Sequence, residues 1–185
     1  PHSAPSPDMF RLTTEPSQAP DVADDVVIGF EKGTPITVNG KALGPFALVS
    51  TLNAIGGRHG VGRIDLVEDR MVGMKSRGVY ETPGGTLLYA AHSELEQLIL
   101  DRKTLAAKDL IAPRYADLVY EGRWWTTARE AYDAFVNVTQ ERSTGTVKPR
   151  TCQGGPQDVC RSSEHALYAR GLVPLASCHA VERPR

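Results

Sequence analysis

The spacing of the apolar residues changes twice along this chain of 185 residues, and the order of the changes restricts its fold. Short apolar runs come first, at residues 26–30 and 35–38, and Asn39-Gly40, a strong hairpin-turn signal, follows the second run. Helical spacing dominates the middle of the chain, and weak strand character returns after Thr146. Strands, then helices, then a late strand pair predict an α+β fold instead of a series of βαβ units.

Two helices are expected after the first strands. Pro45 suits the first position of the earlier helix, whose apolar residues recur at every third position: Phe46, Val49, Leu52 and Ile55. Gly56-Gly57 is expected to end it. The later helix is predicted from apolar residues with helical spacing, namely Leu87, Leu88, Ala91, Leu95, Leu98 and Ile99. Between the two helices, in residues 61–83, single apolar residues are scattered among charged residues and glycines, which predicts two extended strands.

Two further helices are predicted in the second half of the chain. One runs from Thr104 to Tyr120, with a break or kink expected at Pro113. The other opens at residues 127–130, where Thr-Ala-Arg-Glu fits a capping box. Its inward-facing residues are expected to be Ala131, Phe135 and Val138.

Composition excludes several classes of function. The formal net charge of −1 gives no reason to expect nucleic-acid or membrane partners, and no apolar run approaches the ~20 residues that span a bilayer. Residues 1–5 lack the charged flank and apolar core of a signal peptide. Without a Cys-x-x-Cys spacing we expect reduced thiols, and a metal site near His165 and His179 is the weaker alternative. The cysteines are Cys152, Cys160 and Cys178.

Charged and polar side chains concentrate between Gly57 and Pro83. Over residues 58–77 there are five Lys/Arg and three Asp/Glu, and glycines interrupt the stretch. One interpretation is a wall for a polar ligand that the glycines let the backbone approach. The other is a solvated hairpin whose charges pair with one another.

The residue types alone yield no complete reaction centre, so no catalytic residue and no metal ligand is assigned. No phosphate-binding loop, dinucleotide fingerprint or nucleophile elbow is present. His59 is better explained as a capping or structural histidine than as a general base. The Trp124-Trp125 pair is better explained by packing in a core or interface than by ligand binding.

Thirty consecutive positions nevertheless resemble a known family. Residues 56–63 read Gly-Gly-Arg-His-Gly-Val-Gly-Arg, and residues 73–86 read Gly-Met-Lys-Ser-Arg-Gly-Val-Tyr-Glu-Thr-Pro-Gly-Gly-Thr. Both runs, in register with the segment between them, are similar to a signature stretch of argininosuccinate synthases. The likeness covers residues 26–147 well and the proline-rich residues 1–25 loosely. The chain is thus identified as resembling the second, carboxyl-terminal domain of that family.

The resemblance implies a defined reaction. The family uses ATP, with Mg²⁺, to activate citrulline as a citrullyl-adenylate with release of pyrophosphate. The amine of aspartate then displaces AMP and forms argininosuccinate, for arginine synthesis in the cytoplasm. ATP and aspartate contacts belong to an amino-terminal nucleotide-binding half that has no counterpart in these residues. The second domain completes the citrulline pocket and carries the contacts of a homotetramer.

Two citrulline contacts follow from the resemblance, position by position. They fall on Glu68, whose carboxylate suits the ammonium group, and on Tyr80, whose phenol suits a polar edge of the substrate. The alternatives are structural: Glu68 would pair with Arg63 or Arg70, and Tyr80 would be an ordinary strand aromatic. If the segment between them folds back as a hairpin, the two side chains can converge on one small ligand.

The resemblance also divides the chain. Residues 1–25, with five prolines, are expected to be a linker laid over a surface, and residues 26–170 the citrulline-contacting and multimerisation domain. Residues 171–185 form a divergent tail. Pro149 departs from the apolar strand of the family, and a proline is restricted to sheet edges or bulges. The rival hypothesis is a stand-alone citrulline-binding or oligomerisation module without catalysis.

Overall fold

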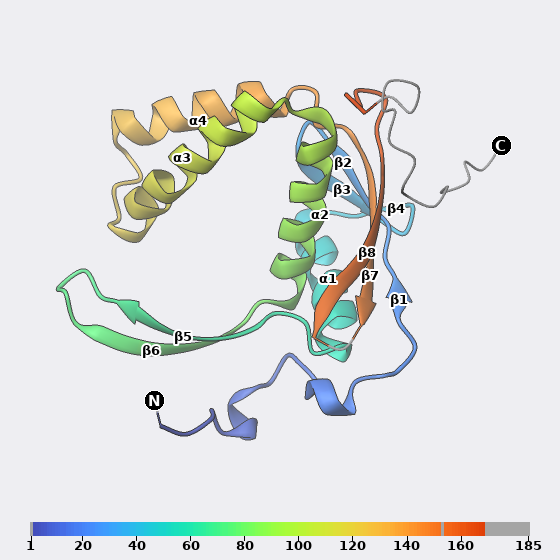
Figure 1. Ribbon diagram of the computed structural model, residues 1–185, viewed down its shortest axis with the longest axis vertical. Coiled ribbons are helices and arrows are strands. Elements are labelled where there is room, and N and C mark those ends of the chain that lie inside the picture. The colour runs from blue at the N-terminus through green and yellow to red at the C-terminus, as the bar shows by residue number, and fades with distance from the viewer. Residues whose placement is uncertain (1, 153, 169–185) are drawn as a thin grey trace.

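The computed structural model describes residues 2–152 and 154–168 and has two layers, an antiparallel sheet with helices packed on one face (Figure 1). The helices are α1 (Pro45–Arg58), α2 (Pro83–Ile99), α3 (Arg102–Tyr120) and α4 (Thr127–Gln140), preceded by the 3-10 turns η1 (Pro7–Met9) and η2 (Pro16–Gln18). The strands are β1 (Asp24–Asp25), β2 (Ile28–Glu31), β3 (Thr34–Val38), β4 (Lys41–Ala42), β5 (Arg63–Asp69), β6 (Lys75–Glu81), β7 (Gly145–Cys152) and β8 (Gly155–Ser162). The α+β prediction is confirmed.

Six of these strands form the main sheet within the described residues. β1 and β2 lie end to end along one edge of β7 in a single register, with Asp24 opposite Thr151 and Ile28 opposite Val147. β3 and β4 extend the sheet beyond β2, and β8 pairs with the other edge of β7. The predicted turn Asn39-Gly40 joins β3 to β4, and its φ values of 50° and 77° suit a tight hairpin turn.

The late strand pair lies deeper in the sheet than its sequence suggests, because β7 has partners on both edges. Its Pro149 is fully buried, and the β7–β8 register shifts between Lys148 and Arg150. Proline has no amide hydrogen to donate, so the irregularity at Pro149 costs no hydrogen bond to β8. On the other side, the Pro149 carbonyl accepts a hydrogen bond from the amide of Val26 at 3.1 Å.

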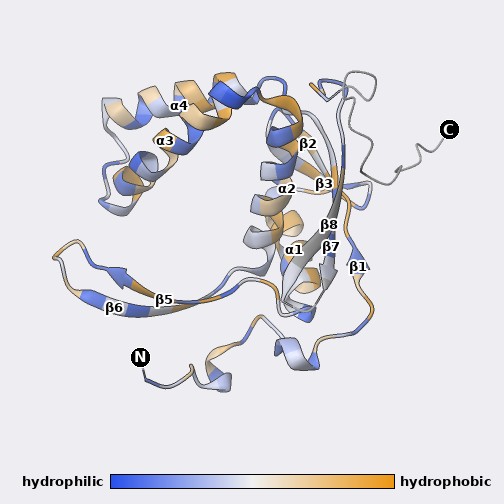
Figure 2. Ribbon diagram, in the orientation of Figure 1, coloured by the Kyte–Doolittle hydropathy of each residue, from blue (hydrophilic) through white to orange (hydrophobic). Residues whose placement is uncertain are grey.

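The core lies where α1 and α2 meet the sheet, and hydrophobic and hydrophilic residues alternate along both helices (Figure 2). Its fully buried residues include Ile28, Leu48, Leu52, Leu87, Leu95 and Val147. The face predicted for α1 is partly wrong, because Phe46 is 87% exposed and Val49 40%. The predicted helix end is also wrong, since α1 continues through Gly56-Gly57 to Arg58. Gly56 packs on Pro83 of α2 so closely that a methyl group there would be crowded.

The helices α3 and α4 lie side by side as an antiparallel pair that extends from the end of α2, away from the main sheet (Figure 1). Helix α3 continues across Pro113, so the expected break is absent from it. The side chain of Thr126, and not that of Thr127, caps α4 by accepting from the amide of Arg129. Of the residues predicted to face inward, Ala131 and Val138 are exposed and Phe135 is half-buried.

The remaining strands, β5 and β6, form a long two-stranded hairpin that projects from the core on the same side as α3 and α4 (Figure 1). The hydroxyl of Tyr120, at the end of α3, lies 3.5 Å from the carbonyl oxygen of Asp69 near the hairpin turn. None of the helices in the described part of the chain combines the length and apolar character needed to cross a membrane. The tail at residues 171–185, with Cys178 and His179, lies outside the described residues.

Candidate functional site

The β5–β6 hairpin brings together the two residues singled out from the sequence. Its register places Glu68 opposite Ser76 and Ile64 opposite Tyr80, so Glu68 and Tyr80 share one face of the hairpin. The Tyr80 hydroxyl donates a hydrogen bond of 2.6 Å to Oε1 of Glu68. The predicted hairpin is therefore present, and the two side chains converge as expected. Their contact with citrulline stays a prediction.

Gly78 explains how Tyr80 reaches Glu68 along the hairpin. The two residues are not a directly opposed pair, because Leu66 and Gly78 occupy the register position between them. A Cβ atom added at Gly78 would lie 2.4 Å from Cε2 of Tyr80. The ring therefore lies across the space that any side chain at position 78 would fill.

The alternatives raised for Glu68 are not what the structure shows. Among the described residues, no ion pair joins Glu68 to Arg63 or Arg70. The hydrogen bond to Glu68, together with partial burial, raises the pKa of Tyr80 above its ordinary value, so the phenol stays protonated. The Ser76 hydroxyl, opposite Glu68, is buried and has no hydrogen-bond partner among the described residues. Ser76 was missed by sequence reasoning, although the hairpin register would have placed it there.

The opposite face of the hairpin fits the other interpretation, a surface whose charges pair with one another. Arg77 donates two hydrogen bonds of 2.7 Å to the carboxylate of Asp65. Lys75 pairs with Asp69, also at 2.7 Å. Such exposed pairs contribute little to stability. One face of the hairpin thus neutralises its own charges, and the other presents Glu68 and Tyr80.

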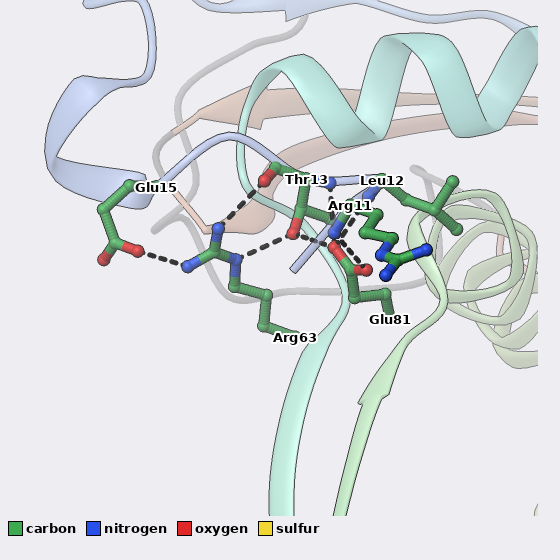
Figure 3. A network of polar contacts seen from close by, with 6 residues as sticks. All are labelled: Arg11, Leu12, Thr13, Glu15, Arg63 and Glu81. Atoms are coloured by element: carbon green, nitrogen blue, oxygen red, sulfur yellow. Dashed lines mark hydrogen bonds and ion pairs between the residues drawn. The ribbon is translucent and has the colours of Figure 1, made fainter. Parts of the chain in front are cut away.

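The root of the hairpin holds the amino-terminal segment through a network of polar contacts (Figure 3). Glu81 accepts hydrogen bonds from three consecutive amides, those of Arg11, Leu12 and Thr13, at 2.7–3.0 Å, and from the Thr13 hydroxyl at 2.5 Å. Arg63, directly opposite Glu81 in the register, donates to the hydroxyl and the carbonyl of Thr13. Sequence reasoning missed this network, although a hairpin turn centred on position 72 would have paired Arg63 with Glu81.

The glycines at residues 56–62 serve the chain's own backbone, which corrects the interpretation that they admit a ligand. A Cβ atom at Gly57 would lie 2.1 Å from the carbonyl oxygen of Leu12. A Cβ atom at Gly62 would lie 2.6 Å from the carbonyl carbon of Thr82. The close approach at Gly57 lets the amide of Thr14 donate to the Gly57 carbonyl at 2.8 Å.

The other candidate residues have structural surroundings. His59 is fully buried at the end of α1, and its Nε2 lies 2.9 Å from Oδ2 of Asp24. This position agrees with the structural explanation of His59. Trp125 is 87% exposed, which excludes a place in the core of the described domain. The described residues contain no group of three or more His, Cys, Asp or Glu side chains arranged to hold a metal ion.

The Glu81 network predicts a pH dependence. Partial burial pushes the pKa of Glu81 upward, but hydrogen bonds from Thr13, Arg11 and Leu12 outweigh burial and hold the pKa below its ordinary value of 4.5. A lowered folded-state pKa stabilises the protein above the ordinary value, and this stabilisation is lost as the pH falls through the folded-state pKa.

Glu81→Gln, which mimics the protonated state, is therefore expected to lower the urea midpoint at neutral pH and to match wild type at acid pH. Urea unfolding between about pH 7 and pH 3 measures this difference. Glu121→Gln, which alters a surface pair with Arg123, is the matched control. A Glu81→Gln deficit that stays constant across this range would contradict the prediction.

Fold and site together define an α+β domain that presents a carboxylate–phenol pair on a projecting hairpin. Residues 1–183 match the family model described as the arginosuccinate synthase C-terminal domain, and the chain belongs to this family.

Proteins called argininosuccinate synthase are similar to it. The one from Roseiflexus sp. (strain RS-1) is 58% identical over 91% of this chain and 41% of that protein. The one from Thermoanaerobacter sp. (strain X514) is 52% identical over 94% of this chain and 42% of that protein. The one from Nitratidesulfovibrio vulgaris (strain DP4) is 47% identical over 96% and 45%. The chain thus spans less than half the length of these relatives.

Proposed function

We propose that this chain is the citrulline-contacting half of an argininosuccinate synthase, a ligase of arginine biosynthesis. The reaction joins citrulline to aspartate through a citrullyl-adenylate, with release of pyrophosphate and AMP. One observation carries the proposal. In a member of this family, the two positions that the family resemblance assigns to citrulline lie on one hairpin face and contact each other at 2.6 Å.

The chemistry of the pair suits citrulline, which has an ammonium group, a carboxylate and a neutral ureido group. Glu68 would accept from the ammonium group, and the Tyr80 oxygen, whose proton is donated to Glu68, would accept from a ureido N–H. Arg70 follows two positions later, and its charge acts on Tyr80. Its guanidinium makes no hydrogen bond or ion pair with other described residues, so it could face the substrate carboxylate.

The other substrates are assigned to a second half of the enzyme. The sequence contains no phosphate-binding loop, and the described residues form no metal cluster. ATP, the Mg²⁺ that neutralises its phosphates, and aspartate would therefore bind mainly outside these residues. In the same proposal, the complete enzyme is a cytoplasmic homotetramer, as the family resemblance implies.

The proposal predicts different activities for two proteins. The chain alone is expected to release no pyrophosphate with ATP, citrulline and aspartate, because its sequence contains no phosphate-binding loop. The joined enzyme, in which this chain replaces the matching segment of the Roseiflexus sp. relative, is expected to turn over. A pyrophosphate assay measures both, with the unmodified relative as control. Turnover by the chain alone would contradict the division into halves.

An inactive joined enzyme that still binds citrulline in calorimetry would favour the rival hypothesis of a binding module without catalysis. An inactive joined enzyme that binds no citrulline, beside an active control, would overturn the proposed function altogether.

A further inference from the structure

The root of the β5–β6 hairpin contains a dense set of polar contacts between parts of the described chain that are distant in sequence (Figure 3). The carboxylate of Glu81 is surrounded by the amides of three consecutive residues, 11–13. Thr13, at the centre of the network, is only 8% exposed. Hydrogen bonds to an ionised carboxylate are stronger than those between neutral groups.

Arg63 completes the network from the facing strand. Its guanidinium donates to the Thr13 hydroxyl at 2.7 Å and to the Thr13 carbonyl at 2.9 Å, and it pairs with Glu15. The same guanidinium lies 3.9 Å from the centroid of the Phe10 ring. We call residues 10–15 with Arg63 and Glu81 the root clamp. Both strands of the hairpin are thus tied to one segment of the chain.

A small rotation of the hairpin at the root clamp would displace the candidate site by several ångströms. Glu68 is five residues beyond Arg63, a distance of roughly 17 Å along an extended strand. At that distance, a rotation of about 10° at the root would move Glu68 by about 3 Å. A two-stranded hairpin is only marginally stable by itself, so its direction depends on what holds its ends.

We propose that Arg63 and Glu81 are positioning residues that fix the direction of the hairpin and thereby place Glu68 and Tyr80 against the substrate. This inference rests on the proposed function of the Glu68–Tyr80 pair. Neither Arg63 nor Glu81 is proposed to touch the substrate. The segment they hold, residues 10–15, lies within the predicted linker, so the clamp also ties the hairpin to the chain that precedes the domain.

Two measurements test the root clamp. In this chain, Glu81→Ala is expected to speed hydrogen exchange at the amides of Arg11, Leu12 and Thr13 by about tenfold or more. In the joined enzyme, the same variant is expected to raise the citrulline KM by about tenfold, because a misplaced contact weakens binding and orientation. The aspartate KM should change much less. Glu81→Gln keeps one accepting oxygen and should give an intermediate effect.

Glu121→Gln is again the matched control, since Glu121 pairs with Arg123 at the surface. If Glu81→Ala frees the three amides but leaves the citrulline KM at the control value, the clamp is only an anchor and the inference is overturned. Amides that stay protected in Glu81→Ala overturn it as well. A citrulline KM that is unchanged in Glu68→Gln would instead count against the proposed site, so the two failures are distinguishable.

Discussion

Glu68→Gln in the joined enzyme is expected to raise the citrulline KM by about 10- to 150-fold. The variant keeps the shape of the side chain. It also keeps an oxygen that can accept from the Tyr80 hydroxyl, which donates to Glu68 Oε1 at 2.6 Å in wild type. It removes the charge that would face the substrate ammonium group, and a charge-assisted hydrogen bond contributes about 1.5–3 kcal/mol. The ATP KM should barely change, because the ATP site is assigned to the other half.

Tyr80→Phe is the companion variant for this measurement. It removes one hydroxyl from the same face of the hairpin, so its expected cost is about 1 kcal/mol, or roughly fivefold in citrulline KM. Steady-state kinetics of wild type and both variants gives the comparison, with circular dichroism as the check on folding. A folded Glu68→Gln enzyme with unchanged citrulline kinetics would show that the Glu68–Tyr80 hydrogen bond is only structural.

Leu95→Ala is expected to lower the free energy of unfolding by about 2–5 kcal/mol, since truncating a buried leucine leaves a cavity. Leu95 is fully buried in α2, and its Cδ1 atom lies so close to Gly145 of β7 that an added Cβ there would be 3.0 Å away. It therefore fills the contact between α2 and strand β7, where the surroundings have little freedom to collapse.

Leu110→Ala is the matched control for this loss. The same truncation on α3 removes a side chain that is 72% exposed, so the expected change is within about 0.5 kcal/mol. Urea unfolding of the 185-residue chain measures both variants against wild type. Equal destabilisation by the two substitutions would mean that the core does not lie between α2 and the sheet.

Sequence patterns predicted those elements whose local preference agrees with their surroundings. The turn at Asn39-Gly40 forms as predicted because Asn and Gly adopt positive φ at little cost. Helix α2 buries Leu87, Ala91 and Leu95, three of the residues whose spacing predicted it. The α+β class followed from the order of such patterns along the chain.

Predictions that depended on a neighbour were less successful. The buried stripe of α1 runs through Leu48 and Leu52. The positions of α2 and the sheet determine which side of this helix is buried. Thr126 caps α4 where a capping box at Thr127 was predicted, since the approach of the preceding turn decides which hydroxyl meets the free amides.

The family and the α+β class could be predicted from the sequence, and Glu68 and Tyr80 could be singled out as candidates, because each depends on residue types in a fixed order. What surrounds these residues became known from the three-dimensional contacts. Hydrogen bonds and steric exclusion depend on which atoms are close in space, and local sequence patterns do not show this. Gly57 packs against the backbone of Leu12, and Glu81 accepts from the amide of Arg11, although both pairs are far apart in sequence. The root clamp exists because the hairpin register brings Arg63 and Glu81 to the same place as this segment.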